Sequence, residues 1–189
     1  MESGSDPSAR DITPSDTFDA QAIDRASVRG PMTAKPSEPK LPEYPEALRR
    51  VFAERPEGRL MGRGHPVGDY LEAFDWELLE ERDCFLRLRV HLPQHVRNPR
   101  GELFGGFTPT YVDLIALLTY RAGHPPGAPR GWLHTMSMRL DYFEPIRDGF
   151  LIESAVIRKR GRNAWIETRF LDAHGTLLAF ALTTLRAAE

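Results

Sequence analysis

The chain has 189 residues, of which 41% are hydrophobic and 28% are charged, a composition typical of one globular domain. Lys and Arg total 25 and Asp and Glu total 27, so the net charge of −2 offers no basic surplus for nucleic acid or a membrane surface. The single Cys84 excludes an internal disulfide framework and a cysteine zinc cluster. No stretch is apolar enough for a membrane span or a secretory signal, so we expect a soluble cytoplasmic protein.

Residues 1–40 differ in composition from the rest of the chain. They contain no Leu, Tyr or Trp, and prolines interrupt every apolar pattern. Such a segment cannot bury enough apolar surface to offset the entropy of ordering it. We therefore predict a disordered N-terminal tail over 1–40, with a short docking motif at 18–23 as the alternative.

Residues 41–69 are predicted to form a short helix and a loop. Residues 46–54 place apolar side chains on one face at helical spacing, and Pro56 and Gly58 end the helix. Residues 59–69 are rich in glycine and are predicted to be a loop. A plain connector is slightly favoured over a flap that covers a site.

A strand hairpin is predicted next. Residues 70–79 alternate irregularly, residues 80–83 are predicted to be a polar turn, and residues 84–92 alternate strictly between apolar and polar side chains. A period of two is typical of an antiparallel strand that buries one face. This pattern places Cys84 on the inward face, where we expect a core position rather than a nucleophile.

One strong helix signal follows at residues 107–122. Gly105 and Gly106 open the helix, and Gly123 ends it. Pro109 falls in the first turn, where no intrahelical hydrogen bond is lost. The segment is apolar on nearly every face, so we expect it to be buried on most sides.

Four further strands are predicted over residues 133–143, 149–159, 164–172 and 176–186. The last two breaks between them are short enough for hairpin turns. A central helix that needs apolar cover fits inside a long sheet that supplies an apolar face. We predict an α+β fold in which one antiparallel sheet wraps around the long helix, with residues 70–189 as the folded domain.

Asp113 is the residue with the clearest chemical meaning. A carboxylate within an apolar helix costs free energy unless it is paired or hydrogen-bonded. Its neighbours at helical spacing, including Gly106, Pro109 and Ala116, are mostly small and leave room for a cleft. Asp113 is thus a candidate base or nucleophile, and a structural Asp bonded to an arginine or to backbone is an equally weighted alternative.

Gly105 and Gly106 suggest a second component of a site. A helix N-terminus offers unpaired N–H groups, and glycine lets a substrate carbonyl approach the backbone closely. The two glycines are therefore a candidate oxyanion hole, with the Asn98 amide as a polar clamp. The alternative is an ordinary tight turn between a strand and a helix.

A basic turn lies between two of the predicted strands. Four cations in residues 158–162, chiefly Arg158, Lys159 and Arg162, suit an anionic group such as a nucleotide phosphate, and a solvated turn is the commoner alternative. His91 and His95 stand four residues apart, but Pro93 prevents the helix that a metal-binding pair at this spacing needs. We expect neither a metal site nor a cofactor.

The run from Asn98 to Gly106, followed by Asp113, resembles the signature of the hot-dog-fold acyl-CoA thioesterases of the PaaI type. In that pattern an Asn, a Gly and a His-Gly-Gly triplet precede a helix that carries an acid seven residues after the second Gly. The similarity extends from about residue 70 to residue 185 and includes residues 142–145 and the basic turn. The tail and the first predicted helix lie outside it.

The resemblance implies hydrolysis of an acyl-CoA thioester to a carboxylic acid and free CoA. It also implies subunits paired as a homodimer or homotetramer, with the sites at the subunit interface. By position, Asp113 is similar to the acid that activates water or attacks the thioester, and Gly105 to the backbone oxyanion donor. Asn98 is similar to the residue that positions the thioester or the water, and Thr135 to a hydroxyl that assists the water. The basic turn is similar to the region that meets the coenzyme A phosphates.

Phe104 departs from the family pattern, because it stands where the family has His. A phenyl ring neither donates nor accepts a hydrogen bond, so any orienting role of that ring is lost, whereas the backbone donor at Gly105 remains. Phe104 and Gly106 are expected to contact the substrate. The aromatic residues Phe107, Tyr111 and Trp132 are further candidates for the acyl pocket, with core positions as the alternative.

Two other functions stay open at this point. The first is an acyl-CoA-binding hot-dog module without turnover, which the loss of the family His favours and the presence of Asp113 and Thr135 disfavours. The second is a hot-dog dehydratase, which needs a His–acid pair. His134 is the nearby histidine, and strand alternation points it away from the face of Thr135.

Overall fold

The predicted strands form one antiparallel sheet in the order β1-β2-β4-β5-β6-β3. The computed structural model describes residues 50, 51, 53–123 and 132–188. The strands are β1 (Glu77–Arg82), β2 (Phe85–Val90), β3 (Leu133–Tyr142), β4 (Phe150–Arg160), β5 (Asn163–Leu171) and β6 (Leu177–Ala187). The predicted tail lies outside the described residues, as does most of the helix predicted over 46–54, of which residues 50, 51 and 53 are helical.

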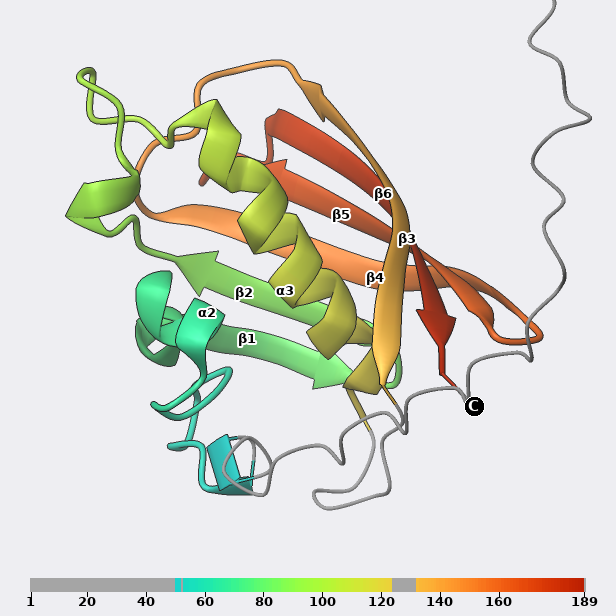
Figure 1. The fold of residues 1–189 in the computed structure, drawn as a ribbon. Helices are drawn as coiled ribbons and strands as arrows, with labels where there is room; N and C mark the ends of the chain where they lie inside the picture. Colours follow the sequence, from blue (N-terminus) through green and yellow to red (C-terminus); the bar gives the residue numbers. More distant parts are fainter. Residues whose placement is uncertain (1–49, 52, 124–131, 189) are drawn as a thin grey trace, which may run out of the picture. The chain divides into compact units, whose positions relative to one another are not determined.

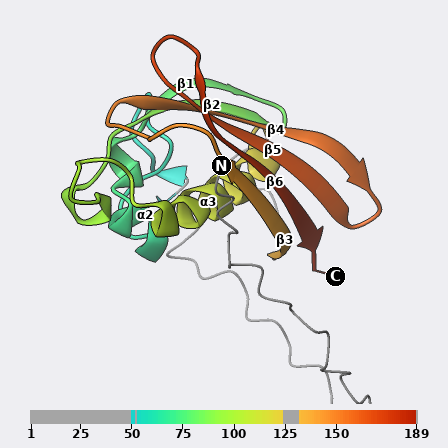
Figure 2. The same cartoon turned by 90° about the horizontal axis from the view of Figure 1, so that it is seen from above.

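The long helix α3 (Thr108–Arg121) lies against the sheet, which curves around it (Figures 1 and 2). Eight of its 14 residues are buried, including Tyr111, Ile115 and Leu118. This burial follows from its nearly continuous apolar surface. The prediction of an α+β fold, with one antiparallel sheet wrapped around a long central helix, is confirmed.

Strand periodicity sets which side chains meet the helix. In β2 the buried residues Leu86, Leu88 and Val90 alternate with more exposed ones. Leu88 pairs with Ile152 of β4, and both are fully buried. The sheet therefore presents a continuous apolar face to α3, and the last four predicted strands agree with β3 to β6 within one residue at each end.

The prediction for residues 70–83 is wrong in two ways. The segment before β1 holds the short helix α2 (Pro66–Tyr70) and the turn η1 (Ala73–Asp75), where a loop and a strand were expected. The buried side chains of this segment do not alternate as in a strand, because their spacing is set by the part of the core that they cover. They are Leu71, Ala73 and Trp76. Second, β1 includes residues 80–82, which were predicted to be a polar turn.

The turn between β1 and β2 lies at Asp83 and Cys84. Cys84 has a φ of 57° and is partly exposed, so its predicted inward position in a strand is wrong. Its N–H donates to the carbonyl of Ala122 at 3.3 Å. Gly123 has a φ of 76°, and a Cβ there would lie 2.6 Å from the Cα of Asp83. Glycine is therefore required where the end of α3 meets this turn.

Candidate active site

The candidate site begins with Asp113, which lies on α3 beside the edge strand β3 (Figure 1). The Thr135 hydroxyl of β3 donates to Asp113 Oδ1 at 2.5 Å. No bond reaches Oδ2 from the described residues. The structure thus brings two of the predicted site residues together. The partner of Asp113 among the described residues is a hydroxyl, not the arginine or backbone group of the alternative, and one carboxylate oxygen stays available.

Gly105 and Gly106 lie in the turn η3 (Gly105–Phe107), directly before α3. The first N–H groups of a helical segment have no partner within it, and both glycines are exposed to solvent. The N–H groups of Phe104 and Phe107, by contrast, donate to Val96 and Phe104 carbonyls. Two adjacent N–H groups without a backbone acceptor among the described residues therefore stand at the exposed positions predicted for an oxyanion hole.

Asn98 lies in a tight turn that supports this loop. Its Oδ1 accepts hydrogen bonds from the backbone N–H groups of Arg100, at 2.8 Å, and Glu102, at 3.1 Å. Its amide nitrogen is 3.4 Å from Glu102 Oε2. Within one chain the Asn98 side chain therefore shapes the turn, and its contact with a substrate stays a prediction.

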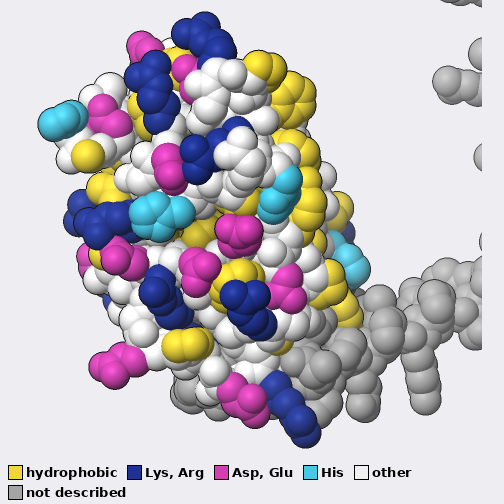
Figure 3. Space-filling view, turned by 90° about the vertical axis from the view of Figure 1, so that its left-hand side faces the viewer, with side chains coloured by type: hydrophobic (Ala, Val, Ile, Leu, Met, Phe, Trp, Pro, Cys, Tyr) yellow, Lys and Arg dark blue, Asp and Glu magenta, His cyan; other side chains and the backbone are white. Residues whose placement is uncertain are grey.

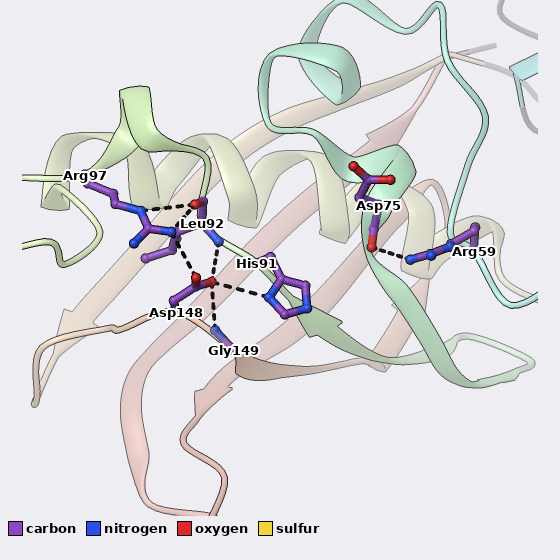
Figure 4. A network of polar contacts seen from close by, with 7 residues as sticks. All are labelled: Arg59, Asp75, His91, Leu92, Arg97, Asp148 and Gly149. Atoms are coloured by element: carbon purple, nitrogen blue, oxygen red, sulfur yellow. Dashed lines mark hydrogen bonds and ion pairs between the residues drawn. The ribbon is translucent and has the colours of Figure 1, made fainter.

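A charged network fixes the base of the same loop (Figure 4). Asp148 accepts hydrogen bonds from Leu92 N at 2.8 Å, Gly149 N at 3.0 Å and Arg97 Nη2 at 2.9 Å. The Arg97 guanidinium also donates to the Leu92 carbonyl, at 2.6 Å from Nη2. Partial burial alone would raise the pKa of Asp148, but these hydrogen bonds outweigh it and lower the pKa.

The Phe104 ring is 53% exposed and covers Gly106. A Cβ on Gly106 would lie 2.8 Å from this ring, so only glycine fits beneath it in this rotamer. Phe104 meets Phe107 edge to face at 5.9 Å, and Phe107 lies 6.0 Å from Tyr70. An apolar surface thus borders the two backbone donors, and a band of hydrophobic side chains is visible along one border of the face in Figure 3.

Tyr111 belongs to the core rather than to a pocket. It is fully buried and stacks on Trp76 at 5.4 Å. Burial raises the pKa of its hydroxyl, which has no hydrogen-bond partner among the described residues. For Tyr111 the core alternative is therefore correct, whereas Phe107 and Trp132 are partly exposed and remain candidates.

The basic turn is anchored near the C-terminal end of α3. Lys159 Nζ donates to Cys84 Sγ at 2.9 Å, and this hydrogen bond raises the pKa of Lys159. Arg162 Nε donates to the Ala187 carbonyl at 2.9 Å. Arg158 lies 6.0 Å from the centre of the Trp165 ring. These three cations therefore stand together on one end of the sheet.

One chain does not bring all predicted residues together. Asp113 is eight residues from Gly105, which corresponds to a separation on the order of 10 Å along α3 and η3. The basic turn and Gly105 lie toward opposite ends of α3, about 20 Å apart for a helix of 14 residues. An oxyanion donor must lie within about 3 Å of the thioester oxygen, and a base within about 3 Å of the attacking water. The predicted donor, base and basic turn are therefore spread along one helix within a single chain.

Sequence reasoning missed Tyr142 and Arg97 as parts of the site. Tyr142 donates its hydroxyl hydrogen bond to the Gly105 carbonyl at 2.7 Å, from 37 residues away. Residues 142–145 were noted as part of the family resemblance, but no local pattern links them to the glycines. Arg97 is likewise joined to Asp148 across 51 residues. Only the sheet topology reveals such pairs.

Comparisons with solved structures confirm the hot-dog fold. Thioesterase superfamily member 2 from Mus musculus is 20% identical, with a TM-score of 0.54, and the match covers 65% of this chain and 90% of that one. A putative thioesterase from Ralstonia eutropha JMP134, related to phenylacetic acid degradation, is 18% identical, with a TM-score of 0.54 and coverage of 66% and 92%. A Streptococcus mutans UA159 protein bound to acetyl CoA is 14% identical, with a TM-score of 0.51 and coverage of 60% and 89%.

These likenesses define the fold at low sequence identity. Several of the structural neighbours are described as thioesterases, and the resemblance found in the sequence is confirmed at the level of the fold. Neither a family model nor a curated protein sequence matches the chain. Across the described residues, no helix combines the length and the apolarity that a membrane crossing requires.

Proposed function

We propose that this protein hydrolyses acyl-CoA thioesters to a carboxylic acid and free CoA. The observation that supports this most directly is the Asp113–Thr135 pair, at 2.5 Å, on a helix that directly follows the exposed Gly105 and Gly106. A base and a pair of oxyanion donors are the two components that acyl transfer to water needs. Thioesterases with this fold, among them one solved with coenzyme A, are consistent with the proposal.

Asp113 is the base or the nucleophile in this mechanism. As a base, its free Oδ2 takes a proton from water, and the hydroxide attacks the thioester carbonyl. As a nucleophile, it attacks the carbonyl itself, and water hydrolyses the resulting anhydride. In both routes the C–S bond breaks, and the CoA thiolate leaves and is protonated. The Thr135 hydroxyl orients the carboxylate, and the Gly105 N–H stabilises the oxyanion.

A second copy of the chain completes the site in this proposal. Because Gly105 and Asp113 of one chain lie on the order of 10 Å apart, a carbonyl between them needs one of the two groups from another subunit. β3 is an edge strand that pairs with β6 alone among the described strands, and its Met136 is 56% exposed. An exposed apolar edge strand favours pairing with a second chain. We therefore propose a homodimer, or a tetramer built from it.

The coenzyme A phosphates are assigned to the basic turn. Arg158, Lys159 and Arg162 cluster there, about 20 Å from Gly105 of the same chain. In the proposed dimer, the turn of one subunit binds the CoA of a thioester held by the other. We expect the two arginines to contribute more to phosphate binding than Lys159, because a planar guanidinium can bind a phosphate through two N–H groups at once. Asn98 and Phe104 are proposed to flank the thioester.

Phe104 favours a second candidate function, an acyl-CoA-binding module without turnover. Its ring replaces the family's histidine and supplies no hydrogen bond, so the acyl group would be held by apolar contact alone. Asp113 and the Gly105 N–H are nevertheless present, which favours hydrolysis. The cytoplasmic location expected from the sequence stays part of the proposal, and fractionation of cells that produce the chain tests it.

The decisive experiment measures free-thiol release from acetyl-, hexanoyl-, palmitoyl- and benzoyl-CoA, with the wild type and Asp113→Asn side by side. We expect turnover of at least one ester and a loss of about 1,000-fold in the variant. Asp141→Asn is the matched control, because Asp141 pairs with Arg139 at 3.0 Å on β3 and lies outside the site. Saturable binding of the esters with no thiol release by the wild type would instead establish the binding module.

A further inference from the structure

The peptide that joins Gly105 to Gly106 is held by hydrogen bonds at its carbonyl end. Its carbonyl oxygen, on Gly105, accepts the Tyr142 hydroxyl at 2.7 Å and also the N–H of Thr108. Its N–H, on Gly106, is in the first turn of the helical segment and has no partner there. Since C=O and N–H point in opposite directions across a trans peptide, the bond to Tyr142 turns the Gly106 N–H outward.

Tyr142 is well placed for this role. It is the last residue of β3 and pairs with Ala179 of β6, so the sheet fixes its backbone. Its side chain is half exposed, and its ring atoms lie 3.9 Å from the position of a Cβ on Gly105. Tyr142 thus touches the glycine loop without belonging to the buried core, and its hydroxyl makes no other hydrogen bond to the described residues.

We propose that Tyr142 is a positioning residue for a second oxyanion donor, the Gly106 N–H. The inference rests on the proposed thioester hydrolysis. A hydrogen bond accepted by a carbonyl polarises its peptide and strengthens the N–H on the other side. The Tyr142 hydroxyl therefore both orients the Gly106 N–H and makes it a better donor. The Phe104 ring, which covers Gly106, keeps water from one side of this donor.

The donor itself can be observed by NMR. Residues 105 and 106 form the one Gly-Gly pair in the 189-residue sequence. Protein labelled with ¹³C-carbonyl and ¹⁵N glycine therefore gives a single carbonyl–amide correlation, from the Gly105 carbonyl and the Gly106 N–H. In Tyr142→Phe we expect the Gly105 carbonyl carbon and the Gly106 amide proton both to move upfield, because the polarising hydrogen bond is lost. The control is Tyr120→Phe, which makes the same chemical change near the other end of α3. It is expected to leave both chemical shifts unchanged.

The kinetic measurement uses the best acyl-CoA ester found for the wild type. In Tyr142→Phe we expect kcat to fall about 5- to 10-fold with KM unchanged, because an oxyanion donor acts in the transition state. Removing an oxyanion donor outright costs 100-fold or more, and the Thr108 bond remains, so the effect is smaller. The Tyr120→Phe variant is expected to keep the wild-type kcat. Thermal unfolding within about 2 °C of wild type shows that both variants are folded.

The two measurements separate the inference from the function on which it rests. A moved correlation with a lower kcat and an unchanged KM supports the role of Tyr142. If the chemical shifts of Tyr142→Phe equal those of the wild type, or if they move while kcat stays at the wild-type value, this role of Tyr142 is wrong. If the wild type releases no thiol from any ester, thioester hydrolysis fails and the catalytic part of the inference fails with it. The NMR shift alone then decides whether Tyr142 orients this peptide.

Discussion

Two carboxylates near opposite ends of β3 differ in how many hydrogen bonds they accept. Beyond the C-terminal end of the strand, Asp148 accepts three hydrogen bonds from two backbone N–H groups and Arg97. Near its N-terminal end, Asp113 accepts one bond from Thr135 and keeps an oxygen available. A carboxylate with hydrogen bonds to both oxygens stabilises the backbone around it. A carboxylate with one oxygen free of hydrogen bonds can take a proton from a ligand or from water.

The network around Asp148 also supports the loop that carries Gly105 and Gly106. Arg97 pairs with Leu103 as an isolated bridge, and the Leu103 N–H donates to the Ile146 carbonyl at 2.8 Å. These contacts fix the start of the Gly105–Gly106 loop against the β3–β4 connection. The proposed function therefore assigns stability to Asp148 and catalysis to Asp113, a division that substitutions can test.

The largest expected effect is on thiol release, which Asp113→Asn should lose and Asp148→Asn should keep. The first variant loses about 1,000-fold in thiol release, because an amide cannot accept the proton from water, and keeps its thermal midpoint within about 2 °C. The second keeps kcat within about threefold. Thiol release and thermal unfolding are measured on the same samples. Equal activity losses in both variants would remove the division between the two regions.

The next effect is smaller and concerns Thr135. In Thr135→Val the Asp113 carboxylate loses its bond of 2.5 Å, and a hydrogen bond to a charged group is worth about 1.5–3 kcal/mol. We expect kcat to fall about 10- to 100-fold. Thr135→Ser keeps the hydroxyl and is expected to retain most of the activity. A serine variant as slow as the valine variant would show that the methyl group, and not the hydroxyl, is what matters.

The parts of the fold and of the candidate site that could be predicted are those that depend on residues close together in the sequence. Periodicity predicted α3 and the last four strands because local patterns record which face is buried. It failed at residues 70–76, where Leu71 and Trp76 follow the shape of the core. Asp113 was named from its place in an apolar helix, and Thr135 through the family pattern. The hydrogen bonds from Tyr142 to Gly105 and from Arg97 to Asp148 span 37 and 51 residues, and only the folded sheet brings these residues together.

The stability effect of Asp148→Asn comes third. The amide group keeps one acceptor but sets an NH₂ group against N–H donors, so part of the network is lost. The Asp148 side chain is 43% exposed, which reduces the expected cost to about 1–2 kcal/mol, or about 3–8 °C in the thermal midpoint. Asp141→Asn, in an exposed pair with Arg139, is expected to change the midpoint by less than about 2 °C. Similar midpoints for the two variants would contradict the structural role of the network.

The smallest expected effect is the acid dependence of the same network. The pKa of Asp148 is lower in the folded chain than its ordinary value of 3.8, so the folded state favours the ionised carboxylate. This contribution to stability is fully present above about pH 4 and is lost as the pH falls through the lowered pKa. The difference in thermal midpoint between wild type and Asp148→Asn should therefore shrink between pH 5 and pH 2.5. A difference that stays constant over this range would show that hydrogen-bond geometry, and not the charge of Asp148, stabilises the loop that carries Gly105.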